Sequence, residues 1–105
     1  MNLPNIITAL VNSQNQYESH SYADCFTDNA VVFDERKTYI GKTEIENWIS
    51  EANNEYKTIM KPLNYDEKEN ILSAEISGTF PGSPAILKYH FEFNNGLIQS
   101  LKITG

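Results

Sequence analysis

The fold is decided by residues 71–104, which read ILSAEISGTFPGSPAILKYHFEFNNGLIQSLKIT. Apolar and polar residues alternate here with a period of two, as they do in β-strands that bury one face. Turn-forming residues divide the stretch into runs at 71–80, 84–93 and 97–104. A further run at 58–65 lies ahead of them, so the pattern predicts an antiparallel meander of four strands joined by hairpins.

The two faces of this predicted sheet differ in polarity. One face is almost wholly apolar and is expected to pack against helices. Its residues are Leu72, Ala74, Ile76, Gly78, Phe80, Leu87, Tyr89, Phe91, Phe93, Leu97, Leu101 and Ile103. The other face is polar, as in sheets that meet water or a wet protein interface, and includes Lys88, His90 and Glu92. Because long strands in a twisted sheet curl, we expect a curved sheet.

Helices are expected ahead of the meander. Apolar residues at three- and four-residue steps over 3–17 predict a first amphipathic helix, and the spacing over 22–26 predicts a short second helix ended by 27–29. Thr43 and Glu46 form the pattern of a capping box, which opens a third helix ending near Tyr56.

Two short strands are predicted between the second and third helices. The segments 30–34 and 37–40 flank Glu35 and Arg36, which suggests a tight hairpin. With 105 residues, of which 40% are apolar, the chain has the size of one domain, spanning 1–105, with one hydrophobic core. The fold class predicted from the pattern is α+β.

Charge and cysteine content exclude several function classes. The net charge is −6 and the eight basic residues are scattered, so we expect no nucleic-acid partner and no membrane partner. The single cysteine, Cys25, cannot form an internal disulfide, and there is no zinc-type spacing of Cys and His. We therefore expect no metal and a reducing, cytoplasmic location. Neither a secretory leader nor a membrane span is predicted.

Three stretches in a fixed order carry a family resemblance. They are FTDNAVV at 26–32, GKTEI at 41–45 followed by Trp48, and GTFPGSP at 78–84 leading into YHF at 89–91. Their order and spacing resemble the NTF2-like superfamily, in particular its SnoaL-like and ketosteroid-isomerase-like branches. The resemblance covers nearly the whole chain. It implies a cystatin/NTF2-like cone in which three N-terminal helices pack on a curved, mostly antiparallel sheet, often as a homodimer. It does not imply one activity, because members include isomerases, cyclases, dehydratases and non-catalytic modules.

Asp34 is the first catalytic candidate. The resemblance aligns it with the general-base aspartate of the isomerase branch. A carboxylate in an apolar pocket can have a raised pKa and remove a proton next to a carbonyl, if a second group stabilises the enolate. The alternative is a hairpin-end acid that faces water or pairs with Arg36.

The pattern departs from the isomerase branch at the oxyanion donors. Leu10 stands where that branch has a tyrosine, and an aliphatic side chain cannot donate a hydrogen bond. Tyr89 aligns with the second donor and could take that role, or could be a core aromatic. Removing one such donor typically costs about a hundredfold in rate, so the resemblance does not extend to true ketosteroid isomerisation.

Aromatic residues are numerous enough to line a pocket with a few polar tips. The candidates are Tyr17, Tyr22, Phe26, Phe33, Tyr39, Trp48, Tyr56 and Phe91. Each has a competing interpretation as a packing residue, because the same spacing serves any core. The other reactive side chains have ordinary roles: His90 on the polar sheet face, His20 as a capping residue, and Cys25 as a small core residue.

Two functional hypotheses follow. In the first, the chain binds a small, mostly apolar molecule in a cone-shaped pocket, without a cofactor, and Asp34 with Tyr89 gives it acid–base or isomerase-type activity. In the second, it is a non-catalytic dimeric module whose polar sheet face is the interface. The sequence leaves open whether the chain is an enzyme.

Overall fold

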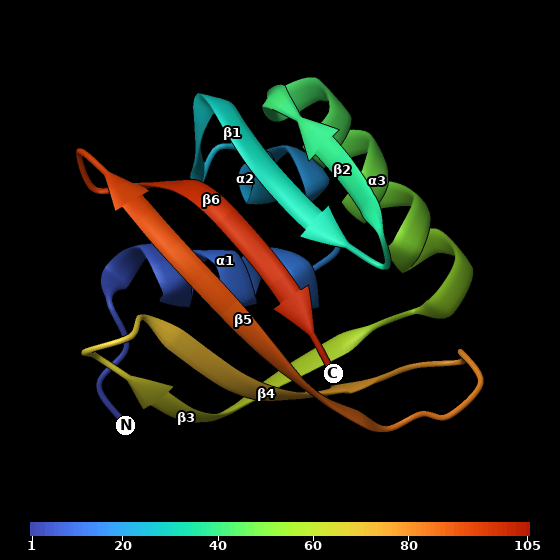
Figure 1. Ribbon diagram of the computed structural model, residues 1–105. Coiled ribbons are helices and arrows are strands. Elements are labelled where there is room, and N and C mark those ends of the chain that lie inside the picture. Colours follow the sequence, from blue (N-terminus) through green and yellow to red (C-terminus); the bar gives the residue numbers. More distant parts are fainter.

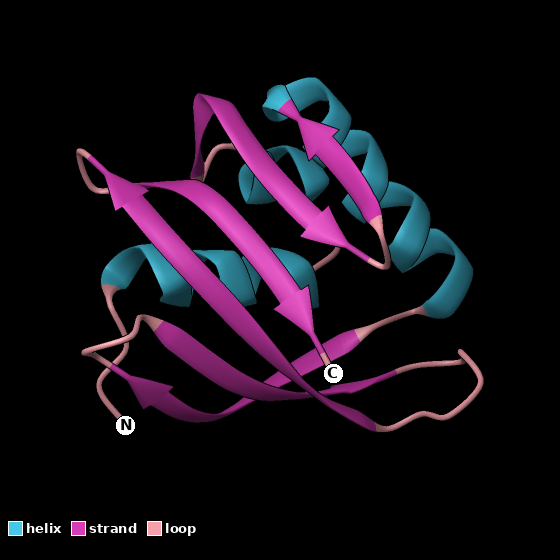
Figure 2. Cartoon of the chain, in the orientation of Figure 1, coloured by secondary structure: helices cyan, strands magenta, loops and turns pink.

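The computed structural model describes all residues, 1–105. Three helices lie on one side of a six-stranded curved sheet (Figures 1 and 2). The elements are α1 (Asn5–Asn15), α2 (Ser19–Ala23), β1 (Phe26–Asp34), β2 (Lys37–Ile40), α3 (Gly41–Tyr56), β3 (Ile59–Asp66), β4 (Ile71–Ser77), β5 (Ala85–Asn94) and β6 (Leu97–Thr104). The α+β class is confirmed, but the helices are not all N-terminal, because α3 follows the first two strands.

The strand order in the sheet is β2-β1-β6-β5-β4-β3. The predicted meander is confirmed, since β3 to β6 pair in sequence order and antiparallel. The remaining junction is parallel: β1 lies beside β6, with Val32 opposite Leu101. This pairing joins the first hairpin to the end of the meander and produces one continuous sheet (Figure 1).

The β1–β2 hairpin is confirmed where the sequence predicts it. Glu35 and Arg36 both have positive φ, at 50° and 66°, as a two-residue type I′ turn requires. This tight turn ends β1 at Asp34, which pairs with Lys37 across the hairpin.

The first helix is shorter than predicted, and the second lies earlier in the chain than predicted. Pro4 precedes the first turn of α1, where its missing N–H is tolerated, but the helix ends at Asn15 and Tyr17 lies beyond it with a φ of 58°. Helix α2 ends at Ala23, and residues 27–29 belong to β1 instead of terminating a helix. A helix of five residues is too short for the spacing of its apolar residues to define where it begins and ends.

Helix α3 starts at Gly41, two residues earlier than predicted, and without the Thr43 and Glu46 capping box. Instead the Glu44 carboxylate accepts a hydrogen bond from the Ile40 N–H at 2.9 Å. Its buried face carries Ile45, Ile49 and Asn53.

The loop after β4 closes the other end of α3. The Thr79 N–H donates to the Tyr56 carbonyl at 2.7 Å, and the Phe80 ring lies edge-on to the Tyr56 ring at 6.0 Å. A Cβ at Gly78 would lie only 2.5 Å from the Tyr56 carbonyl oxygen. The glycine is therefore required by a close backbone approach.

The core lies between the helices and the apolar sheet face, as predicted. Leu72, Ala74, Tyr89, Phe91 and Leu101 are buried there. One difference arises at a β-bulge between Glu92 and Phe93, which shifts the register against β6. As a result Ile98 is fully buried and Leu97 is half-buried. None of the three helices has the length and apolarity needed to cross a membrane.

Candidate functional site

Three titratable side chains from different elements share one region of the core. Asp34 is the last residue of β1, Tyr89 lies on β5, and Tyr22 lies on α2. Strand β6 lies between the strands of Asp34 and Tyr89. Its Ile103 pairs with Tyr89. Its Lys102 pairs with Phe33, which is one residue before Asp34. Asp34 alternates with Phe33, so its side chain lies on the helix-facing side of the sheet with Val32 and Tyr89. We call Asp34, Tyr22 and Tyr89 the acid–phenol cluster.

The pKa of Asp34 is raised from 3.8 to about 6. Burial is the main cause, and the charge of Glu35 adds to it, while a hydrogen bond from the Glu35 backbone acts in the opposite direction. Because the side chain is only half-buried, water can still reach it. A carboxyl group of this kind can both accept and release a proton near neutral pH.

The two phenols of the cluster are buried, and one of them has a hydroxyl without a hydrogen-bond partner. Tyr22 is fully buried, and its hydroxyl has no hydrogen-bond partner. Tyr89 is 3% exposed, and its pKa is raised by burial and then by the charge of Asp34, with no hydrogen bond opposing either effect. The pKa of Tyr22 is raised by burial and then by Tyr89, Cys25 and Asp34. Since charge effects fall with distance, these mutual influences require the three groups to be close.

Aromatic rings connect this cluster to the protein surface. The Tyr22 ring meets Trp48 of α3 edge-on at 6.1 Å, and Trp48 stacks on Tyr39 of β2 at 5.4 Å. Both Trp48 and Tyr39 are half-buried. Deeper in the core, the ring centroids of Phe26 and Tyr22 are 5.7 Å apart, and those of Phe91 and Tyr89 are 6.5 Å apart. The predicted residues Phe26, Tyr39, Trp48 and Phe91 therefore lie around the acid–phenol cluster.

Three other predicted pocket residues lie apart from it. Phe33 points to the opposite face of the sheet from Asp34 and is 42% exposed. Tyr17 follows the end of α1 and is 46% exposed. Tyr56 is half-buried at the end of α3 against Phe80, and its pKa is raised first by a hydrogen bond to Glu55 and by the charge of Glu55. We leave Phe33 and Tyr17 out of the candidate site.

The sequence prediction placed Tyr22 and Tyr39 among the possible pocket aromatics but gave Tyr22 no hydrogen-bonding role. Tyr22 stands in the same apolar spacing as Cys25 and Phe26, so it resembles an ordinary core residue. The only available signal was its hydroxyl, which a buried helix position needs to satisfy. Leu10 is fully buried in the core, and Tyr22 offers the donor that Leu10 lacks.

The acid–phenol cluster combines one proton acceptor with two donors. The Asp34 carboxylate could take a proton from a bound molecule, and the phenols could donate to an oxygen on which negative charge develops. The interior side chains are tightly buried, so the accessible part of the site is at Asp34, Tyr39 and Trp48. No group of three or more His, Cys, Asp or Glu side chains is arranged to hold a metal ion.

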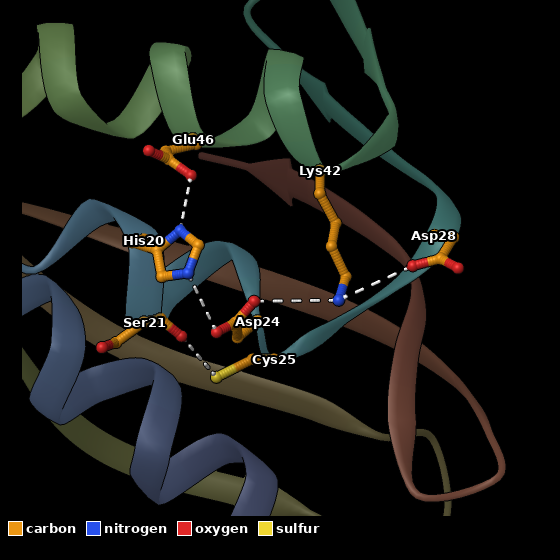
Figure 3. Close-up of polar contacts among 7 residues, drawn as sticks. All are labelled: His20, Ser21, Asp24, Cys25, Asp28, Lys42 and Glu46. Atoms are coloured by element: carbon orange, nitrogen blue, oxygen red, sulfur yellow. Dashed lines mark hydrogen bonds and ion pairs between the residues drawn. The ribbon is translucent and has the colours of Figure 1, made fainter.

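A second polar cluster joins α2 to α3 on the surface (Figure 3). His20 lies between Glu46, at 3.1 Å, and Asp24, at 3.5 Å, and Lys42 reaches Asp24 and Asp28. The His20 pKa is raised by its hydrogen bond to Glu46 and then by the charge of Asp24. His20 therefore pairs with carboxylates and does not cap a helix. These groups are exposed and paired with one another, which is typical of a solvated surface network.

Cys25 lies beneath this network and is buried. Its thiol donates to the Ser21 carbonyl at 3.5 Å (Figure 3), and burial raises its pKa to about 11. It is therefore a poor nucleophile near neutral pH. His90 lies half-buried on the outer sheet face, where its ring bonds Thr104 at 3.0 Å, as its strand position predicts.

Two open depressions lie near the start of α1, away from the acid–phenol cluster. Their volumes are about 340 and 430 Å³, and both are lined by Pro4, Tyr65 and Asn70. Neither contains an unpartnered buried polar group, and the Tyr65 hydroxyl is already bonded to Asn70 at 3.0 Å. We therefore place the candidate site at the acid–phenol cluster, where polar groups are left free to bind.

Comparison with known proteins identifies the fold and the family. No protein-family model matches the sequence, and no curated protein matches it either. Among solved structures, a proposed polyketide cyclase from Sinorhizobium meliloti is 30% identical, with a TM-score of 0.90 over 97% of this chain and 95% of that one.

Two more distant structures share the fold. A hypothetical protein from Catenulispora acidiphila has a ketosteroid-isomerase-like fold and was solved with trimethylamine. It is 15% identical, with a TM-score of 0.86 over 99% of this chain and 87% of that one. An NTF2-like protein of unknown function from Cytophaga hutchinsonii is 12% identical, with a TM-score of 0.76 over 95% and 86% of the two chains. From the 30% identity over nearly the full length of both chains, this chain belongs to the NTF2-like superfamily, in its SnoaL-like and ketosteroid-isomerase-like branch.

Proposed function

We propose that the chain is a single-domain acid–base protein that binds a small carbonyl compound and removes a proton next to the carbonyl. Asp34 is the base, and Tyr22 and Tyr89 donate hydrogen bonds to the developing oxyanion. The observation that carries this proposal is the fully buried Tyr22 hydroxyl, which has no partner in the protein and lies within the field of Asp34. A buried polar group without a partner is costly, and a ligand oxygen would satisfy it.

The structural neighbours support the class of the proposal without fixing its chemistry. The Sinorhizobium protein is a proposed polyketide cyclase, which supports a carbonyl compound as the kind of ligand. The Catenulispora protein was solved with a small molecule, trimethylamine, which supports small-molecule binding on this scaffold. No cofactor enters the proposed step, because the proton moves from carbon to the Asp34 carboxylate.

The experiment that tests the proposal is proton exchange in deuterated water, which can be followed for many candidate carbonyl compounds in parallel. A panel of cyclic ketones and β-ketoesters is incubated with the protein, and loss of the α-proton signal is followed by NMR. We expect Asp34→Asn to lower the exchange rate about a hundredfold, the scale of a general base. Asp28→Asn is the matched control, because it makes the same change at an exposed residue of the same strand. Exchange that is equal in wild type and Asp34→Asn for every compound would overturn the proposal.

The same assay predicts a pH dependence. Asp34 accepts a proton only when ionised, and its pKa is about 6. The exchange rate should therefore rise with pH up to about 6 and level off above it. A rate that levels off already near pH 4 would point to an unburied carboxylate as the base.

A second candidate function is a non-catalytic module that dimerises through the outer face of the sheet. The observation that favours it is the exposure of large apolar side chains on that face, with Phe33 at 42% and Ile86 at 60%. Light scattering of wild type and of a Lys88→Glu/His90→Glu variant tests it. A homodimer that separates in the variant would support this interface, and an unchanged mass would exclude it.

A further inference from the structure

We propose that the ligand carries a positive charge, as a quaternary or protonated amine, held at a rim formed by Tyr39, Trp48, Glu35 and Glu51. This inference rests on the proposed function, because it names the class of ligand for the same site. The rim lies where the β1–β2 hairpin faces α3, at the accessible end of the acid–phenol cluster.

Negative charge is concentrated at this rim, and its carboxylates are not in ion pairs. Burial raises the pKa of Tyr39, and the charges of Asp34, Glu35 and Glu51 raise it further, so three carboxylates act on one phenol. All four ion pairs of the structure involve His20 or Lys42, and none includes these carboxylates.

The basic residues nearest to the rim leave its carboxylates unpaired. Lys37 is opposite Asp34 in the hairpin, and Arg36 lies in its turn. Both are exposed, and neither makes an ion pair. A cation at the rim can therefore pair directly with a carboxylate, whereas an anion would lie beside unpaired carboxylates.

The aromatic surface between these carboxylates suits a cation as well. Tyr39 and Trp48 stack with their ring centroids 5.4 Å apart and their planes 27° apart, and both are half-buried. Tryptophan and tyrosine faces attract cations through their ring quadrupoles, most strongly where water is partly excluded. A carboxylate beside such a ring adds direct charge attraction.

An independent observation points to a ligand atom behind the rim. The Tyr22 hydroxyl is fully buried and unpartnered, and the centroids of the Tyr22 and Trp48 rings are 6.1 Å apart. Because Tyr22 is not exposed, a ligand on the rim reaches this hydroxyl only when the side chains around it move apart. The proposed ligand therefore has a cationic end at the rim and a polar atom that bonds to Tyr22.

Trp48 allows a direct test because it is the only tryptophan in the chain. Its fluorescence is titrated with three probes of similar shape: choline, its neutral carbon isostere neohexanol, and the anion tert-butylacetate. We expect choline to bind about tenfold more tightly than neohexanol, and the anion to bind most weakly, because only choline gains the cation–π and carboxylate attraction. Added salt should reduce the preference for choline.

Two variants locate the effect. Glu35→Gln/Glu51→Gln should weaken choline binding several-fold and leave neohexanol binding unchanged, because it removes charge without removing volume. Glu67→Gln/Glu69→Gln, at the exposed β3–β4 turn, is the matched control and should change neither. Because these exposed residues do not support the core, the variants should fold.

The outcomes separate this inference from the proposed function. Equal affinity for choline and neohexanol, with α-proton exchange still dependent on Asp34, would overturn the cation preference and leave the acid–base proposal standing. Loss of choline binding in the Glu35→Gln/Glu51→Gln variant, with no α-proton exchange in any protein, would remove the acid–base proposal and keep the cation site. If neither choline nor neohexanol changes Trp48 fluorescence or stabilises the protein to heat, the cation site is excluded.

Discussion

The interior of this protein holds two groups of polar side chains, and they are satisfied to very different degrees. In the first, which we call the amide cluster, Gln14, Asn15, Asn53 and Thr58 join α1, α3 and β3. Gln14 donates to Thr58 at 3.1 Å, Thr58 donates to Asn53, and Asn53 donates to the Gln14 carbonyl at 3.3 Å. The acid–phenol cluster has no comparable network, and its Tyr22 hydroxyl is unbonded.

Asn15 makes the contrast sharper. Its side-chain amide accepts from the Met60 N–H at 2.7 Å and donates to the Met60 carbonyl at 2.9 Å, so it pairs with β3 as a neighbouring strand would. Within the amide cluster only the Gln14 side-chain oxygen lacks a partner. Polar groups that are bonded to one another hold elements together, whereas polar groups left unbonded at a half-open site remain free for a ligand. The amide cluster therefore has a structural role, and we propose a binding role for the acid–phenol cluster.

The largest predicted effect tests the structural role. Asn53→Ala should lower the free energy of unfolding by about 3 kcal/mol, because it leaves buried groups of Gln14 and Thr58 unpaired. Urea denaturation measures the change, with Asn54→Ala on the exposed side of the same helix as control. A loss no greater than that of the control would mean that the amide cluster does not hold the helices.

An intermediate effect is expected at Asp34, and it depends on pH. Because its pKa is raised to about 6 in the folded state, the native protein binds this proton more tightly than the unfolded chain. Stability is then greatest below about pH 4 and declines as the pH rises through 6. Asp34→Asn removes that decline and should stabilise the protein at pH 8 by about 1 kcal/mol, after allowing for solvent screening of this partly exposed group.

Thermal or urea unfolding at pH 4 and pH 8 measures this difference. The variant and the wild type should converge at the lower pH and separate at the higher one. A variant that is less stable than wild type at pH 8 would show that Asp34 is a structural acceptor, like the groups of the amide cluster.

The smallest effect is expected at Tyr22. Tyr22→Phe removes a buried hydroxyl that has no partner, so we expect stability to stay unchanged or to rise by about 0.5 kcal/mol. Tyr65→Phe is the matched control, since its hydroxyl is bonded to Asn70, and it should lose about 1 kcal/mol. If Tyr22→Phe is destabilising to the same degree, the two phenols have the same role and the contrast between the clusters fails.

The sequence predicted local structure and sheet faces better than it predicted long-range pairing. The hairpin at Glu35 and Arg36 and the meander were found because alternation and turn residues are local signals. The parallel pairing of β1 with β6 was not predicted, because no local pattern indicates which distant strand is a neighbour. The bulge at Glu92 and Phe93 likewise changed which residue of β6 is buried.

For the candidate site, the sequence identified residue types but not their partners. Asp34 and Tyr89 were selected through a family resemblance, and their placement in one region depends on β6 lying between their strands. Tyr22 was named only as a possible pocket aromatic, because a tyrosine in an apolar helical stripe looks the same whether or not its hydroxyl is bonded. Phe33 was chosen as an aromatic residue beside Asp34, but neighbours along a strand point to opposite faces.

The parallel contact between β1 and β6 also has a consequence for the order of folding. It pairs Phe26 with Ile98, so a loop of about seventy residues must close before the sheet becomes continuous. Contacts of such high sequence separation form late and slow the folding rate. The β3–β6 meander can assemble from neighbouring hairpins, but the first hairpin must wait for β6 before it can join. Asp34 and Tyr89 therefore meet only in the last stage of folding, and a partly folded chain would have the carboxylate and the phenol on separate pieces.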